Sequence, residues 1–203
     1  MLGDELKCAL RWQRDAEQRN NQGRTFPTRG HMSRLKKFVS VFLIALSAAF
    51  MLPDAKAATL PQPTGKVLLT VSGAITQHNT GDEAAFDRAM LQSLGMHKLR
   101  TTNPFETGIH EFEGVLLRDV LDKVGATGSK LIAFALDGYA VEIPASDARE
   151  YEVLLALVWN GKQMTVRNKG PIWVIYPLDR YDELKDEKYS ARSIWQLGRL
   201  VVQ

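Results

Sequence analysis

The chain has 203 residues, a formal net charge of +3 and one cysteine, Cys8. Residues 1–57 hold ten Lys and Arg against five Asp and Glu, so residues 58–203 carry a net charge of −2. This balance excludes a strongly basic nucleic-acid-binding face in residues 58–203, which also lack a cysteine for a disulfide or a thiolate metal site.

Residues 32–57 have the pattern of a secretory signal peptide. Three basic residues at 34–37 precede a nearly unbroken apolar run over 38–52, and Ala55-Lys56-Ala57 is a small-x-small cleavage site. The apolar run is shorter than a spanning helix requires, which argues against the alternative of an uncleaved anchor. We therefore expect a periplasmic or secreted protein with no membrane span after cleavage.

The other boundaries follow from this signal. Residues 1–31 have no apolar periodicity, and a signal peptide normally begins at the N-terminus, so we expect translation to start at Met32. Residues 58–64 are predicted to be a linker. Residues 65–203 are long enough for one domain with its own core.

Apolar periodicity and turn residues predict the elements of this domain in chain order. The predicted strands cover residues 66–72, 96–102, 109–112, 130–136, 139–143, 152–159, 162–165, 172–176 and 195–202. Helical spacing predicts helices over 83–94 and 115–124 and one helical turn over 146–149. Asp137-Gly138 and Asn160-Gly161 predict tight hairpins, and residues 179–190 a charged loop. Strands dominate, with two or three helices, so the predicted class is α+β.

Residues typical of common catalytic sites are not grouped in this domain. No phosphate-binding loop, Gly-x-Ser-x-Gly or His-Glu-x-x-His occurs in the sequence. His78, His97 and His110 are widely spaced, which favours partly exposed residues over the alternative of a zinc site. Trp159, Trp173 and Trp195 have the positions of core aromatics. We predict neither catalytic residues nor metal ligands.

Two stretches have the features of a binding site. Residues 100–104 end a strand with hydroxyls, an amide and a proline. Residues 167–177 place Lys169 beside Gly170-Pro171, where a cation and exposed backbone amides favour an anion. Strand ends and loops are common places for sites.

The order of several short motifs resembles the oxidoreductase molybdopterin-binding domain, the sulfite oxidase fold. They are a strand ending in Thr-Thr and the segments 112–121, 137–144, 155–164, 169–177 and 195–197. The resemblance runs from about residue 65 to 202 and is strongest to short, exported, single-domain bacterial members. It implies a mixed α+β fold with a three-layered sandwich and a barrel-like sheet.

The resemblance also implies a cofactor site from which this chain departs. In catalytic members a pterin dithiolene holds molybdenum, and a protein cysteine adds a sulfur in the region that matches residues 101–105. Here these residues read Thr-Thr-Asn-Pro-Phe, which contain no soft ligand. The basic pair before the final Trp is reduced to Arg192, and the arginine of the Gly-Pro strand is Trp173. The resemblance allows a molybdopterin, whereas the residues predict no cofactor.

We therefore expect an exported, non-redox domain that binds a small anionic or pterin-like ligand or a periplasmic partner protein. The alternatives are a molybdopterin-dependent oxidoreductase and an interaction domain without a small-molecule site. The predicted binding residues comprise a polar wall, an anion end and an aromatic side. They are Thr101, Thr102 and Asn103, then Lys169 and Gly170, and finally Tyr176 and Trp195.

Overall fold

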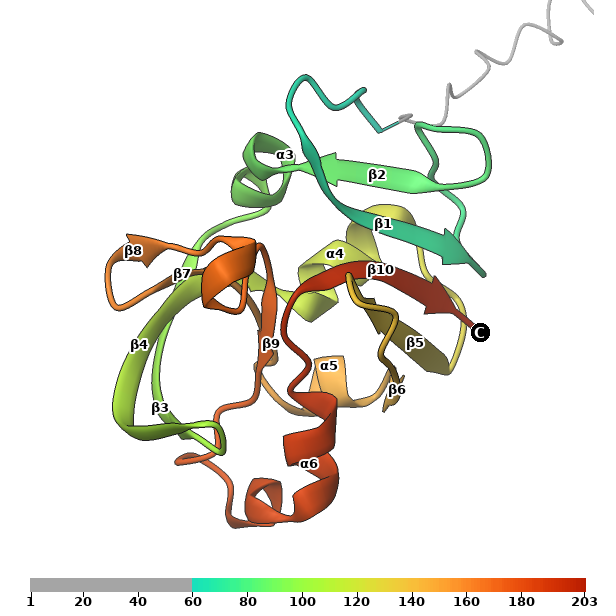
Figure 1. The fold of residues 1–203 in the computed structure, drawn as a ribbon. Helices are drawn as coiled ribbons and strands as arrows, with labels where there is room; N and C mark the ends of the chain where they lie inside the picture. The colour runs from blue at the N-terminus through green and yellow to red at the C-terminus, as the bar shows by residue number, and fades with distance from the viewer. Residues whose placement is uncertain (1–59) are drawn as a thin grey trace, which may run out of the picture. The chain divides into compact units, whose positions relative to one another are not determined.

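The computed structural model describes residues 60–203. The expected N-terminal extension, the signal peptide and the first two residues of the linker lie outside the described residues. Within residues 60–203 the chain forms two five-stranded sheets and four α-helices, so the predicted α+β class is confirmed (Figure 1).

The first sheet combines the start, the middle and the end of the domain. Its strand order is β2-β1-β10-β5-β6 (Figure 1). The strands are β1 (Val67–Gly73), β2 (Ala84–Asp87), β5 (Lys130–Ala135), β6 (Ala140–Pro144) and β10 (Leu197–Val202). Only β1 and β10 pair in parallel, and the other pairs are antiparallel. The fold is therefore not an alternating βαβ arrangement.

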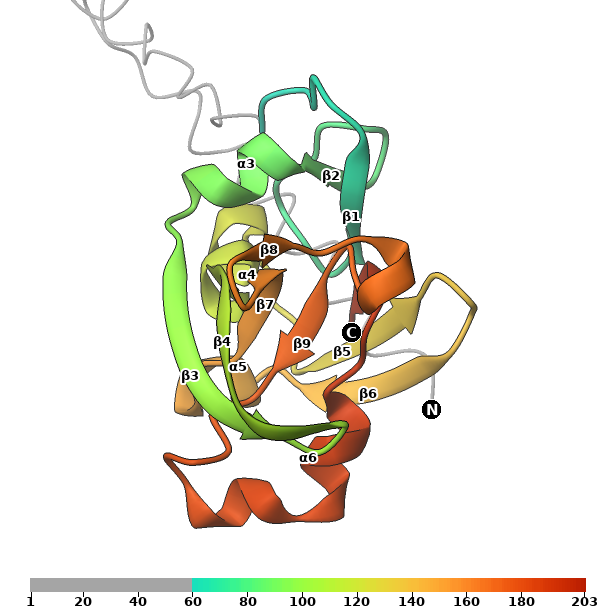
Figure 2. The same cartoon turned by 60° about the vertical axis from the view of Figure 1, so that its left-hand side comes forward.

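The second sheet is built from the centre of the chain. Its order is β3-β4-β7-β8, and β9 also pairs with β7. The strands are β3 (His97–Asn103), β4 (Glu106–Leu116), β7 (Leu154–Trp159), β8 (Lys162–Gln163) and β9 (Trp173–Ile175). Figure 2 shows β3 and β4 as a long curved hairpin whose tip lies close to α6. This hairpin tip is one wall of the site described below.

Short helices connect the sheets. They are α3 (Arg88–Ser93), α4 (Leu117–Val124), α5 (Asp147–Glu150) and α6 (Glu187–Arg192), with 3-10 turns η2 (Val166–Asn168) and η3 (Asp182–Lys185). Helix α4 buries Leu117, Val120, Leu121 and Val124 and ends at Gly125, whose φ of 60° is left-handed. This confirms Gly125 as the predicted stop, because glycine adopts that conformation without a steric penalty.

Three sequence predictions were wrong in detail. The helix expected over 83–94 begins only at Arg88, because residues 84–87 are buried against β1 as strand β2 and Asp87 caps α3. The helix expected over 115–124 begins at Leu117, since residues 115–116 extend β4. The charged loop expected over 179–190 contains η3 and most of α6. In the first two cases sheet pairing overrides local helical spacing.

Two apolar clusters form the core. The larger one joins the first sheet to α4 and to one face of the second sheet. The smaller one lies within the curve of the second sheet and includes Phe112 and Trp173, both fully buried. Trp173 donates to the Ser193 carbonyl oxygen at 3.1 Å, which ties this core to the end of α6. The two clusters leave a third group of aromatics partly uncovered.

Candidate functional site

The uncovered aromatics line a cavity of about 480 Å³ between three loops. Phe105 comes from the β3–β4 turn, Tyr139 from the β5–β6 turn and Trp195 from the segment between α6 and β10. Their exposed fractions are 39%, 52% and 37%. The ring centroids of Phe105 and Trp195 are 4.8 Å apart in an edge-to-face arrangement. A cavity of this size and aromatic content suits a small organic molecule.

Two carboxylates complete the polar part of the lining. Asp137 lies in the β5–β6 turn, and Glu187 is the first residue of α6. The remaining wall is made of small, hydroxyl or aliphatic side chains: Ala135, Ser190, Ala191, Ser193 and Ile194. No Lys or Arg belongs to this lining. The cavity is therefore apolar and aromatic with a net acidic character.

Turn chemistry places Asp137 and Tyr139 on the cavity. Gly138 has a φ of 92°, which a residue with a side chain adopts only under strain. The Oδ1 atom of Asp137 accepts a hydrogen bond from the backbone N–H of Tyr139 at 3.0 Å. This Asx turn fixes both residues and leaves the second carboxylate oxygen free of hydrogen bonds to other described residues.

Lys169, predicted as an anion end, lies inside a cage of tryptophans. Its Nζ atom is 4.9 Å from the ring centroid of Trp173, 5.7 Å from that of Trp195 and 5.9 Å from that of Trp159. It also forms an ion pair with Glu106 on β4. The ammonium group thus already has a carboxylate partner and three π faces.

Gly170, the second residue predicted for the anion end, is buried beside this cage. Its backbone N–H donates to the Thr165 carbonyl oxygen at 2.8 Å. A Cβ atom added at Gly170 would lie 2.7 Å from the backbone of Met164, so the chain packs too closely for a larger residue. Its amide is therefore occupied within the fold.

The predicted polar wall at the end of β3 is bound to the loop after β9. Thr102 donates its backbone N–H and its hydroxyl to the two Asp179 oxygens at 2.7 and 2.6 Å. Thr101 accepts from the Asp179 backbone N–H at 3.3 Å. The Thr102 hydroxyl is the main cause that lowers the pKa of Asp179 below its ordinary value. These hydroxyls therefore hold a loop in place.

Asn103 has a buried amide that is only half satisfied. Its Oδ1 atom accepts from the Phe105 backbone N–H at 2.7 Å, which shapes the turn that presents Phe105. Its Nδ2 atom is buried and has no hydrogen-bond partner among residues 60–203. The side chain is 7% exposed. Asn103 thus supports the cavity from behind without lining it.

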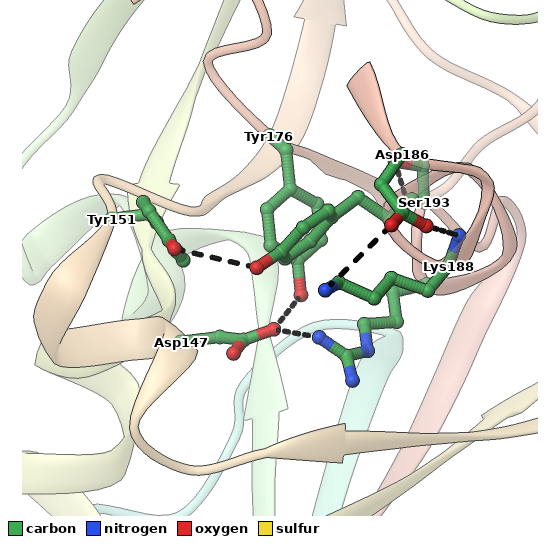
Figure 3. Close-up of polar contacts among 8 residues, drawn as sticks. Asp147, Tyr151, Tyr176, Asp186, Lys188 and Ser193 are labelled. Atoms are coloured by element: carbon green, nitrogen blue, oxygen red, sulfur yellow. Dashed lines mark hydrogen bonds and ion pairs between the residues drawn. The ribbon is translucent and has the colours of Figure 1, made fainter. Parts of the chain in front are cut away.

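Tyr176 belongs to a separate, closed cluster (Figure 3). Its hydroxyl donates to Asp147 Oδ2 at 2.7 Å, and Arg192 donates to the same oxygen at 3.0 Å. Burial, followed by the Asp147 charge, raises the pKa of Tyr176 above its ordinary value of 10.0. The Arg192 guanidinium lies 5.1 Å from the Tyr189 ring centroid. Arg192 is therefore held by a buried carboxylate.

The structure brings only part of the predicted site together. Of the seven predicted residues, only Trp195 lines the cavity. Lys169 is outside the lining, and its Nζ atom lies 5.7 Å from the ring centroid of Trp195. The other predicted residues lie outside the lining and bind within the fold. Sequence reasoning missed Phe105, Asp137, Tyr139 and Glu187. Two signals were available, because Phe105 follows Asn-Pro and Tyr139 follows Asp-Gly, where a tight turn exposes the next side chain.

Residues 85–179 match the family model of the oxidoreductase molybdopterin binding domain. This match supports an oxidoreductase molybdopterin-binding domain in this part of the chain. The resemblance inferred from the motif order is thereby confirmed, together with the sulfite-oxidase-type α+β fold. A search of curated proteins found no match to the chain.

The side chains of this domain do not fit the thiolate-ligated molybdenum centre that the resemblance implies. The stretch at 101–105 contains an amide and a proline in place of a thiolate, and an amide nitrogen has no free electron pair for a soft metal. Lys169 and Arg192, the cations expected near a cofactor phosphate, are paired with Glu106 and Asp147. Within residues 60–203 no group of three His, Cys, Asp or Glu residues has a metal-binding arrangement.

The histidines that left a zinc site open belong to no metal-binding group within residues 60–203. His110 contacts Asn160, and His97 lies 3.8 Å from Asp119, a separation at the limit of an ion pair.

No helix within residues 60–203 is both long and apolar enough to span a bilayer.

Proposed function

We propose that this chain is an exported, non-redox member of the molybdopterin-binding family that binds a small planar organic molecule. The observation that carries the proposal is the cavity between Phe105, Tyr139 and Trp195. Three aromatic side chains from three separate loops converge there, each more than a third exposed, and a concave aromatic lining is typical of a small-molecule site. The residues that would hold a molybdenum centre are replaced or paired internally.

A pterin-like shape remains a suitable ligand for such a cavity, whereas the expected anionic end has less support. Lys169 was predicted to bind the anion, but its ammonium group pairs with Glu106 and is caged by tryptophans. An anionic ligand would have to break this pair and leave a carboxylate without its partner. The aromatic lining, by contrast, is partly exposed, and a flat ring could bind to it without breaking an internal ion pair.

The first experiment compares metal content with ligand binding. The full chain is expressed with its leader, purified from the periplasm, and assayed for molybdenum by mass spectrometry. Thermal shifts are then recorded with planar heteroaromatic compounds, a pterin among them. A compound at 100 times its dissociation constant adds about 2.7 kcal/mol to the free energy of unfolding. We expect a shift with at least one compound from protein that contains no stoichiometric molybdenum.

Variants of the lining make this test specific. Trp195→Ala and Tyr139→Ala should abolish the ligand-induced shift. The matched control is Ile109→Ala, because Ile109 is an exposed apolar residue on β4 outside the cavity lining. Stoichiometric molybdenum with electron transfer to a dye would instead establish the oxidoreductase. A stable complex with a periplasmic protein and no ligand shift would favour the interaction domain.

Export is a separate part of the proposal and rests on the sequence. The pattern over 32–57 predicts a mature chain that begins at Ala58. Mass spectrometry of the N-terminal peptide from the periplasmic fraction tests this. A cytoplasmic protein that retains residues 32–57 would refute export without affecting the cavity.

A further inference from the structure

We propose that the cavity selects a planar aromatic cation, such as a quaternary or protonated nitrogen heterocycle. This inference rests on the proposed function, since it names the chemical class of the ligand bound at the same site. It reverses the charge that a phosphate-bearing pterin would require.

The aromatic rings provide surfaces for a flat, positively charged body. A cation close to the face of Trp, Tyr or Phe is attracted by the negative potential of the ring, most strongly where water is excluded. Trp195 stands edge-to-face against Phe105, and this contact fixes the angle between two walls of the cavity. Tyr139 comes from the opposite hairpin and makes no aromatic contact with either ring. The space enclosed by the three rings is therefore available to a guest.

The carboxylates supply the counter-charge. Neither Asp137 nor Glu187 has an ion-pair partner among residues 60–203. Asp137 uses one oxygen for its turn, and the other is free to accept from a ligand. Both acids are exposed residues on a mostly apolar lining, where a charge interaction is less screened than between two groups in bulk water. A cation on the aromatic rings would therefore also meet two unpaired acids.

The cations nearest to the cavity have partners elsewhere. Lys169 pairs with Glu106 behind Trp195, and Arg192 pairs with Asp147 in the closed cluster. Lys188, next to Glu187 in sequence, lies 3.8 Å from an Asp186 oxygen and 5.0 Å from the Tyr189 ring centroid. Other aromatic groups of the protein contact its own cations, as in Lys169 with Trp173, Arg192 with Tyr189 and Arg199 with Phe134. The cavity lining itself contains no Lys or Arg, although Lys169 lies 5.7 Å from the ring centroid of Trp195.

Three probes of one shape and different charge test the inference. N-methylquinolinium, quinoline and quinoline-2-carboxylate are titrated at neutral pH by calorimetry, together with the change in tryptophan fluorescence. We expect the cation to bind about tenfold more tightly than neutral quinoline and the carboxylate to bind most weakly. The affinity for the cation should fall as salt is added, while that for quinoline should stay constant.

Variants separate charge from shape. Asp137→Asn keeps an acceptor for the Tyr139 turn, and Glu187→Gln keeps the length of the side chain. Each should weaken N-methylquinolinium about three- to tenfold and leave quinoline unchanged. Asp82→Asn is the control, because Asp82 is exposed before β2 and its replacement makes the same change in net charge outside the lining. Trp195→Ala should weaken all the probes that bind.

Each result bears on one proposal or the other. Equal binding of quinoline and its cation, with no effect of the acid variants, would overturn the cationic ligand class and leave the binding function standing. Tightest binding of the carboxylate would overturn the class and restore an anionic ligand. Failure of all three probes would overturn the cationic class, while the metal assay and the pterin screen would decide the binding function independently.

Discussion

Two aromatic clusters flank helix α6, and they differ in whether the protein supplies the positive charge. In the closed cluster, the Tyr176 hydroxyl binds Asp147 (Figure 3). Arg192 pairs with the same carboxylate and lies against the Tyr189 ring. In the open cavity, three aromatic rings meet Asp137 and Glu187 without a lysine or arginine in the lining. In the closed cluster, the aromatic and acidic side chains bind the protein's own Arg192 and stabilise the fold. In the open cavity, the same types of side chain have no lysine or arginine between them and leave space for a ligand.

The Lys169 cage supports this interpretation. It contains an ammonium group among three tryptophans with Glu106 as its counter-ion. Trp195 belongs to this cage and also to the wall of the open cavity. The Trp195 ring therefore contacts the internal cation Lys169 and also lines the cavity. A change that disturbs the cage should for this reason also change the shape of the cavity.

Arg192→Met should have the largest effect on stability. It leaves the Asp147 carboxylate buried with the Tyr176 hydroxyl but without its cation, and an uncompensated buried charge costs about 3–5 kcal/mol. Urea denaturation measures the loss in the free energy of unfolding. The control is Arg180→Met, because Arg180 and Glu152 form an exposed pair whose loss should cost less than about 1 kcal/mol. Equal losses would show that the closed cluster does not depend on its cation.

Tyr176→Phe should cost about 1–2 kcal/mol, since it removes one hydrogen bond to a buried carboxylate. Ligand binding in the open cavity should be unaffected, because Tyr176 does not line it. A loss of ligand affinity without a loss of stability would place Tyr176 in the site after all.

The pH dependence of Tyr176 follows from its raised pKa. Because the folded pKa lies above 10.0, the contribution to stability is complete below pH 10 and is lost as the unfolded phenol ionises above it. Absorbance of tyrosinate in the folded protein should therefore be the same in the wild type and in Tyr176→Phe as the pH rises through 10. A smaller signal in the variant would mean that Tyr176 ionises normally.

Lys169→Met should reduce stability by about 1 kcal/mol, since methionine keeps the contact with the rings but loses the charge. Binding of N-methylquinolinium should persist, because the proposed site needs no lysine. Complete loss of ligand binding with unchanged stability would instead support Lys169 as an anion-binding residue.

Asp179→Asn should have the smallest effect at neutral pH, below about 1 kcal/mol, because the carboxylate is largely solvated. The Thr102 hydroxyl lowers the pKa of Asp179 from 3.8, so the ionised form stabilises the folded state above pH 4, and this contribution is lost as the pH falls further. The variant should therefore lose less stability than the wild type between pH 4 and pH 2. Identical acid denaturation curves would contradict the contact with Thr102.

Local sequence signals located most strands and both hairpin turns. Gly125 ended α4 as expected, because its left-handed conformation depends on the residue itself. The error over 83–94 has a non-local cause, since residues 84–87 are helical by spacing and become β2 through pairing with β1. The region after Asp179 failed for a similar reason: α6 is held by burial of Tyr189 and the Arg192–Asp147 pair, which the charge pattern does not reveal.

Motif order and residue identity were enough to indicate the molybdopterin-binding resemblance, the α+β class and the absence of cysteine from residues 58–203, because these need no coordinates. Which polar groups are free became clear from the folded structure. Three groups that look like ligand-binding residues in the sequence are already bound to carboxylates from distant parts of the chain. Lys169 pairs with Glu106, and Arg192 pairs with Asp147. The two threonines at the end of β3 bind Asp179. Whether a charged side chain can bind a ligand depends on which groups lie next to it in the folded protein. Around the cavity these neighbours come from the hairpin turns and from α6.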